Sequence, residues 1–284
     1  MNSDIKISDL HMHGSYSDGK GSLREYAKKA SDLGIATVGI SDHTPLPLDN
    51  CWSMKLSDLE QYLEELEGVK KDFKGRTDVL KGIELDYIDG IDVKGYINFE
   101  ERNFDYFIGS VHYVYSEILD GYYEVDGPRE SFVYLLEEGF AGNIRKLVES
   151  YYSNVRKMIE TYNPKVVAHI DLIKKNNQDN GYFDESSDWY RKQVALTLAK
   201  TKEYRSLVEI NTGAISRGYT EVPYPSDYIL KECLDQGIGI TLNSDAHEPA
   251  NICYLFDEMM EHACKTGYKE IYFLIDGKFM AIEL

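Results

Sequence analysis

Short runs rich in valine and isoleucine recur along the chain, and segments with helical spacing of apolar residues lie between them. Continuous apolar runs of this kind are typical of parallel strands buried on both faces. Strands are predicted at 5–13, 36–43, 78–87, 104–114, 165–172, 206–213 and 238–244, with one more at 270–275. Since no linker interrupts these seven or eight strand–helix units, we predict one α/β domain over residues 1–284, with the strands arranged as a barrel.

Capping signals and apolar spacing place helices between the strands. Ser22 with Glu25, and Ser57 with Glu60, have the spacing of a capping box, in which two side chains satisfy the first backbone amides of a helix. Helices are predicted over 22–34, 57–73, 144–162, 226–237 and about 252–267.

The segment 115–143 is longer than the connection after a barrel strand requires. Two interpretations stay open: an inserted lid or binding loop over the site, or a surface excursion without a role.

Histidines gather where the predicted strands end. In the opening stretch "SDLHMHGSYSDG", two histidines stand at i and i+2, so a strand would point both to one face. Two unrelated surface or core histidines are the alternative for that pair alone. Only His262 lies within a predicted helix, where a surface position is the default. The other six of the seven histidines lie at or near strand ends: His11, His13, His43, His112, His169 and His247.

Three carboxylates occupy comparable positions. Asp18 follows the first strand, Glu84 lies near the end of the third, and Asp245 precedes a histidine at i+2 in "NSDAH". The carboxyl ends of barrel strands face one mouth, so these side chains are expected to meet there. Nine ligands are too many for one tetrahedral zinc. They suit a cluster of two or three divalent ions with positions left for water and substrate.

The charge of the chain limits the partners. Lys and Arg total 31 against 49 Asp and Glu, a formal net charge of −18. Such a field repels long nucleic acid and anionic membranes. It also repels a phosphorylated substrate unless bound cations reverse the local field. A small molecule is therefore the favoured partner.

Cysteine usage and the N-terminus bear on location. Cys51, Cys233, Cys253 and Cys264 show no paired spacing, which is typical of ordinary buried thiols in a reduced compartment. "MNSDIKIS" lacks the apolar core of a signal peptide, and no run of 18 apolar residues occurs. We expect a cytoplasmic protein.

Six motifs in order, "HMHGSYSDG", "SDHTPLP", "GIELDYI", "GSVHY", "AHIDLIKK" and "NSDAH", resemble those of the PHP family of metal-dependent phosphoesterases. The resemblance runs from about residue 8 to about residue 254. "HTPLP" and "ESYYSNV" make it closer to the histidinol-phosphatase branch. The opening histidine pair alone is a weak signal, whereas the ordered set is a strong one.

This resemblance implies a distorted (β/α)7 TIM-like barrel in a single domain, with three divalent ions. His11, His13, Glu84 and Asp245 are expected to hold one ion, and Glu84 to bridge to a second. His112 and His169 complete that second site, while the third is assigned to Asp18, His43 and His247. Zinc, manganese and iron all suit this mixed nitrogen and oxygen set.

Further residues are assigned around the ions. Branch members carry an arginine soon after the sixth strand, and here Arg217 stands one position later than in their pattern. It is expected to bind the phosphate, with Lys174 or Lys175 as further cations near the mouth, although a helix-surface position is the alternative for each lysine. Asp42 is either the acid that protonates the leaving group or a residue that orients a ligand.

The expected reaction is hydrolysis of a phosphate monoester by water whose pKa the ions lower. The resemblance suggests L-histidinol phosphate, in histidine biosynthesis, whereas the residues alone indicate any small phosphomonoester, mononucleotides included. A cationic nitrogen would suit acids of the insertion, namely Glu117, Asp120, Glu124 and Asp126. Rival interpretations are an amidohydrolase, in which Asp18, His43 and His247 have no place, and a non-catalytic domain, which would have lost ligands.

Overall fold

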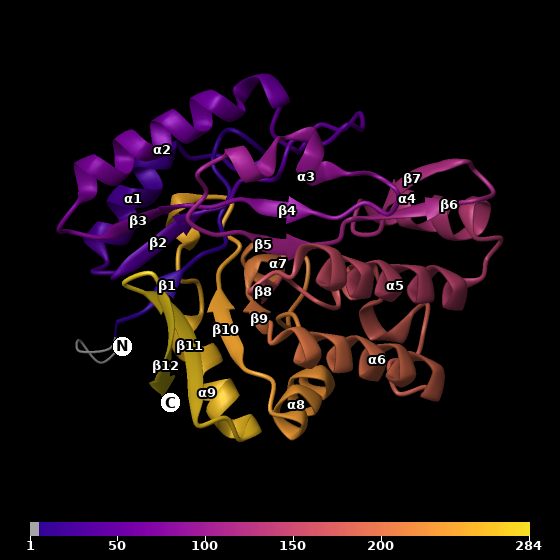
Figure 1. Ribbon diagram of the computed structural model, residues 1–284. Coiled ribbons are helices and arrows are strands. Elements are labelled where there is room, and N and C mark those ends of the chain that lie inside the picture. Colours follow the sequence, from indigo (N-terminus) through magenta and orange to yellow (C-terminus); the bar gives the residue numbers. More distant parts are fainter. Residues whose placement is uncertain (1–5) are drawn as a thin grey trace.

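The computed structural model describes residues 6–284 and contains two parallel sheets (Figure 1). The first has the order β1-β2-β3, formed by Ser8–Asp9, Thr37–Ile40 and Asp78–Lys81. The second has the order β10-β9-β8-β5-β4. Its strands are Glu84–Asp86 (β4), Ile108–Ser110 (β5), Val166–Val167 (β8), Leu207–Asn211 (β9) and Ile240–Asn243 (β10). All pairs within these two sheets are parallel, as predicted.

Each of the seven strands predicted between residues 5 and 244 contains a shorter observed one. The segment 78–87 is divided into β3 and β4, which belong to different sheets. Residue 5, where the first strand was predicted to begin, lies outside the described residues.

The fold is mixed α/β. The two sheets are joined only by single bridges in the described residues, so their hydrogen-bonded ladders do not close into the predicted barrel. The bridges are Met12 with Ala246 and His43 with Glu84. Elsewhere along these junctions, side chains occupy the place of ladder hydrogen bonds. Leu10 N donates to Asn243 Oδ1 at 2.9 Å. Ser244 N donates to Asp9 Oδ1 at 3.0 Å.

Helices follow most of the strands. They are α1 Leu23–Asp32, α2 Leu59–Phe73, α3 Val93–Tyr96, α4 Arg129–Tyr134, α5 Ile144–Tyr162, α6 Asp188–Tyr204, α7 Gly213–Ser216, α8 Asp227–Gln236 and α9 Phe256–Thr266. Short 3-10 turns span Leu56–Asp58, Phe99–Glu101, Leu172–Asn176, Gln178–Asn180 and Pro249–Asn251, and a π-helical turn spans Leu135–Gly139. In Figure 1, α1 and α2 lie along the β1-β2-β3 sheet, and α5, α6 and α8 lie along the other.

The first capping box is confirmed and the second is wrong. Ser22 and Glu25 cap α1 reciprocally. At α2 the N-cap residue is Asp58, whose side chain makes no capping bond, because a 3-10 turn leads into the helix. The helix predicted over 144–162 has those bounds, and α8 lies between Ser226 and Gly237 as predicted. α9 starts later than predicted because a 3-10 turn precedes it.

The segment 270–275 is a strand but does not add an eighth parallel unit. It forms β11, Glu270–Ile275, which pairs antiparallel with β12, Lys278–Glu283. Leu274 N donates to Ser8 Oγ at 2.9 Å, so the hairpin packs beside β1 (Figure 1).

The insertion has structure of its own and shares the main core. Tyr113–Ser116 (β6) and Gly121–Glu124 (β7) form a hairpin, which α4 and the π-helical turn follow. Phe132, Leu135 and Phe140 belong to the hydrophobic cluster that extends along the chain from Ile7 to Ile275. The insertion is therefore anchored to the fold rather than loosely attached.

The four cysteines are free; Cys233 and Cys253 are buried as predicted, whereas Cys51 and Cys264 are exposed, so the prediction is wrong for those two. Among residues 6–284, no helix is both long enough and apolar enough to span a membrane.

Candidate metal centre

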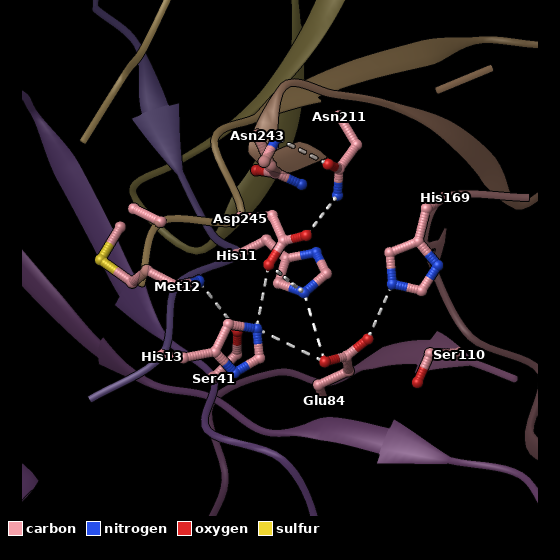
Figure 2. Close-up of polar contacts among 12 residues, drawn as sticks. His11, Met12, His13, Ser41, Glu84, Ser110, His169, Asn211, Asn243 and Asp245 are labelled. Carbon is pink, nitrogen blue, oxygen red and sulfur yellow. Dashed lines mark hydrogen bonds and ion pairs between the residues drawn. The ribbon is translucent and has the colours of Figure 1, made fainter. Parts of the chain in front are cut away.

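All nine predicted ligands meet at the carboxyl ends of the strands. The segments after β1, β2, β5, β8 and β10 supply the histidines, and Glu84 begins β4. Figure 2 shows five of the nine converging: His11, His13, Glu84, His169 and Asp245. Side chains more than 200 positions apart thus lie within one small volume, as the strand-end argument predicted.

Glu84 is the centre of the cluster and is fully buried. Five imidazoles approach its carboxylate: His43 at 2.8 Å, His169 at 3.1 Å, His11 at 3.3 Å, His13 at 3.5 Å and His112 at 3.8 Å. One carboxylate oxygen faces His43, His11 and His13, and the other faces His169 and His112. The two oxygens therefore address two different sets of nitrogen atoms.

Asp245 and Asp18 complete the cluster on the side towards solvent. Asp245 Oδ1 lies 3.2 Å from His13 Nε2 and 3.6 Å from His11 Nε2. Asp18 Oδ2 lies 3.2 Å from His247 Nε2, and its Oδ1 lies 3.9 Å from His43 Nε2.

Several buried donor atoms of the cluster make no hydrogen bond within residues 6–284, namely His11 Nε2, both ring nitrogens of His13, His43 Nδ1 and Glu84 Oε2. Buried polar atoms in native proteins nearly always have a partner, so each of these needs an explanation. Sets of three or four such atoms lie within 4.8 Å of one another. Imidazole nitrogen and carboxylate oxygen at these separations fit divalent cations.

The electrostatics of the cluster put Glu84 and His13 in their metal-binding form, whereas His11, His43 and His112 must lose a proton to bind a metal. Burial lowers the pKa of these three rings, but the nearby carboxylates raise it by more, to about 9 for His112. Burial would raise the pKa of Glu84, but the imidazoles of His43 and His11 hold it well below its usual value. Burial and the nearby His43 and His247 lower the pKa of His13 to about 3, which keeps its ring neutral. Deprotonated carboxylates and neutral imidazoles are the forms that bind metal.

Two buried carboxylates that sequence reasoning missed hold the ligands from behind. Glu209 Oε1 accepts a hydrogen bond from His11 Nδ1 at 2.8 Å, and Glu209 Oε2 accepts from the backbone N–H of His169 at 2.9 Å. Asp86 contacts His112 Nδ1 and lies 3.5 Å from His43 Nδ1. A carboxylate behind a ligating histidine fixes the ring and its tautomer.

A signal for both was present in the sequence. Glu209 is a carboxylate within the apolar strand "LVEIN", and Asp86 stands two positions after Glu84, on the same face of its strand.

Arg217 lies beside the cluster, directly after the short helix α7. Its Nη2 is 3.2 Å from Asp245 Oδ2, and Nη1 contacts His247. Burial lowers the pKa of Arg217, but the negative charge of Asp245 raises it by more, so the net shift is upward. The guanidinium therefore stays charged at the edge of the candidate metal centre.

Three other predicted site residues differ in placement. Asp42 is fully buried and does not line the cavity; its carboxylate accepts from Ser17 N at 2.9 Å. Lys174 is also buried and pairs with Asp171 at 3.0 Å, so the structure does not bring it to the cavity. Lys175 does line the cavity, with Nζ 2.5 Å from the carbonyl of Asp126.

A cavity of about 970 Å³ opens from the cluster. Proposed ligands and Arg217 form one part of its lining, the ligand wall, and Trp52, Glu124 and Asp126 form another part. The other two acids named for the insertion do not line it: Glu117 pairs with Lys146 at 3.0 Å, and Asp120 contacts Tyr115.

The chain was compared with known proteins. The family described as PHP domain matches residues 9–213. A protein named probable histidinol-phosphatase from Deinococcus radiodurans is 28% identical over 279 residues, which cover 94% of this chain and 96% of that protein. The histidinol-phosphatase of Bacillus subtilis is 27% identical over 252 residues, covering 84% and 92%.

A solved structure is similar over nearly the whole chain. Histidinol phosphate phosphatase from Lactococcus lactis, crystallised with zinc, L-histidinol and phosphate, aligns with a TM-score of 0.72 at 22% identity. The alignment covers 97% of this chain and 99% of that one. The likeness extends through the whole fold described above.

Proposed function

This chain belongs to the PHP domain family, and from that premise we propose that it is a metal-dependent phosphatase of small phosphate monoesters, with L-histidinol phosphate as substrate. The products are L-histidinol and phosphate. The observation that carries the proposal is the convergence of six histidines and three carboxylates on one end of a cavity, beside a charged arginine. The two relatives named as histidinol-phosphatases support the choice of substrate.

Three divalent ions are proposed, and the donor groups divide among them as follows. His11, His13, Glu84 and Asp245 would hold the first, and Glu84 with His112 and His169 would hold the second. The donor atoms that lie closest together form overlapping groups: His11 and His13 with Asp245, His11 and Glu84 with His169, and His43 and Glu84 with His112. Asp18, His43 and His247 hold the third. His13 also lies within reach of this last set, so the sites are tightly coupled. Zinc is the first candidate because the Lactococcus lactis structure contains it.

When bound, such ions lower the pKa of water towards neutrality and neutralise the charge of a phosphate. The residues of the chain contribute the rest. Arg217 donates to phosphate oxygens and stabilises charge that spreads over them. Glu209 and Asp86 fix the orientation of the imidazoles.

Asp42 is assigned a structural task. Its carboxylate holds the loop after β1 through the backbone of Ser17, next to Asp18. It thereby positions a ligand, which is the second of the two roles considered for it.

We also propose that the two sheets are the arcs of a distorted (β/α)7 barrel in a single domain. The two bridges at Met12 and His43 support this view, as does the one hydrophobic cluster. The insertion then forms one wall over the mouth.

Phosphate release tests the proposal. Purified enzyme loaded with Zn²⁺ or Mn²⁺ is assayed with histidinol phosphate, sugar phosphates and mononucleotides, and Glu84→Gln is the inactive control. We expect the highest kcat/KM with histidinol phosphate. A clear preference for another monoester or a mononucleotide would overturn the substrate assignment and leave the phosphatase assignment intact.

A further inference from the structure

We propose that Glu124, which lines the cavity beside Trp52, binds the nitrogen-bearing cationic end of the substrate and so determines specificity. This inference rests on the proposed function, because it takes the substrate to be a phosphate monoester that also carries a protonated or N–H-donating nitrogen. Glu124 would then be the side chain that discriminates against phosphate monoesters without a nitrogen of this kind.

The carboxylate of Glu124 is held in a fixed position by neutral donors. Glu124 Oε1 accepts a hydrogen bond from Trp52 Nε1 at 2.6 Å and another from Tyr113 OH at 3.1 Å. Tyr113 is buried and its ring stacks on that of Trp52, with centroids 5.8 Å apart. Two rigid aromatic side chains from different segments therefore aim one carboxylate along the cavity wall.

The negative charge of Glu124 has no positive partner within the described part of the chain, where no lysine, arginine or histidine lies within ion-pair distance of it. The neighbouring acids differ in this respect. Asp126 lies 3.6 Å from Lys175, and Glu117 lies 3.0 Å from Lys146. A half-buried carboxylate that meets only neutral donors is most stable when a cation or an N–H donor joins it.

The position relative to the metal cluster suits a small substrate. The ring of Trp52 lies 4.5 Å from that of His43 and 5.4 Å from that of His112, centroid to centroid. Glu124 thus lies one tryptophan ring away from two proposed ligands. One small molecule can therefore place its phosphate at the proposed ions and, a few bonds away, its nitrogen at Glu124.

The reverse arrangement is disfavoured by charge. Arg217 and Lys20 line the cavity together with Asp245, His247 and Glu248. Arg217 contacts Asp245 and His247, so the phosphate is favoured beside these proposed ligands, and it is repelled by the carboxylate of Glu124. Sugar phosphates and nucleotides would place neutral or anionic groups against Glu124, which leaves its carboxylate uncompensated.

The test compares wild type, Glu124→Gln and the matched control Glu117→Gln. Glutamine keeps an oxygen that can accept from Trp52 and Tyr113, so the wall should keep its shape while the charge is lost. The control removes a charge from the same insertion outside the cavity. Four substrates are compared. Two are histidinol phosphate and the deamino analogue of histidinol phosphate. The other two are 2-aminoethyl phosphate and ethyl phosphate, the last of which contains no nitrogen. Wild-type turnover of histidinol phosphate separately tests the proposed function.

For Glu124→Gln we expect kcat/KM with histidinol phosphate to fall about 10- to 100-fold, mainly through KM, and kcat/KM with ethyl phosphate to stay unchanged. A larger loss with histidinol phosphate than with its deamino analogue identifies the amino group as the partner, and an equal loss identifies the imidazole. Glu117→Gln should match wild type throughout.

An equal loss on all four substrates would overturn the inference, because it would give Glu124 a purely structural role. No loss on any would overturn it as well. If wild type does not hydrolyse histidinol phosphate but does hydrolyse the two ethyl esters, the proposed substrate is wrong. In that case the inference is decided by the ratio of kcat/KM for 2-aminoethyl phosphate to kcat/KM for ethyl phosphate. A fall in this ratio in Glu124→Gln supports the inference, and an unchanged ratio overturns it.

Discussion

The two walls of the cavity are built in different ways. In the ligand wall Asp18 is exposed and His247 is half-buried, whereas the other seven proposed ligands are buried, and carboxylates such as Glu209 and Asp86 hold the imidazoles from behind. The other wall comes from the insertion and from a loop, and Glu124, Asp126 and Trp52 there are half-buried. From this difference we infer that the two walls have different roles. The ligand wall performs the chemistry, and the wall that contains Glu124 selects the substrate.

Glu84→Gln should have the largest effect, because it removes the central charge of the ligand wall. We expect kcat to fall by about 10³-fold or more, equivalent to about 4 kcal/mol of transition-state stabilisation. Phosphate release checks this, and an unchanged circular dichroism spectrum shows that the fold persists. A variant with more than a tenth of wild-type activity would mean that the central carboxylate is dispensable.

Lys174 and Lys175 are adjacent in sequence, but Lys174 is buried against Asp171 whereas Lys175 lines the cavity. Replacing each in turn therefore compares a buried position with a position in the cavity wall. Lys174→Ala should destabilise the protein by about 3 kcal/mol, because it leaves the buried Asp171 carboxylate without its partner. The expected fall in Tm is about 5 to 10 °C.

Lys175→Ala, at the cavity, should change Tm by about 2 °C or less and affect mainly KM. Thermal melts of both variants measure the difference. Equal melting temperatures would contradict the placement of Lys174.

Arg217→Ala should lower kcat by about 10²-fold, since one charged donor to the phosphate is lost. Arg217→Lys keeps the charge but not the planar fork, so we expect an intermediate rate. Steady-state kinetics distinguish the three proteins. If the lysine variant equals wild type, the charge alone suffices and the geometry of the guanidinium does not matter.

Glu209→Gln should have the smallest effect of the four, because this residue touches ligands and not the substrate. We expect metal affinity to weaken about 10- to 100-fold. Competition with a chromogenic zinc chelator measures it, with Glu117→Gln as a control that removes a distant carboxylate. Unchanged affinity would show that the ligand wall does not depend on the residues behind it.

The convergence of the nine proposed ligands could be predicted because strand geometry relates them. His11 and His13 share a face at i and i+2, and parallel strands bring their carboxyl ends together whatever the loops between them do. The choice between the two roles considered for Asp42 could not be made in this way, because it depends on burial and on the hydrogen bond from Ser17, which a sequence does not display.

Other features depended on contacts that a sequence does not display. The ion pair of Lys174 requires Asp171 and a 3-10 turn that buries both. β12 was missed because its pattern is mostly exposed, and it exists through pairing with β11. The position of Glu124 likewise follows from Trp52, 72 residues earlier in the chain, which no local pattern links to it.

Metal analysis of the purified protein tests the central claim most directly, that separate strand ends form one cluster of cations. The account predicts about three divalent ions per chain for wild type and fewer for Glu84→Gln. It also predicts that a chelator removes both the ions and the activity, and that added Zn²⁺ or Mn²⁺ restores them. Full activity in a chain that holds less than one ion would contradict it.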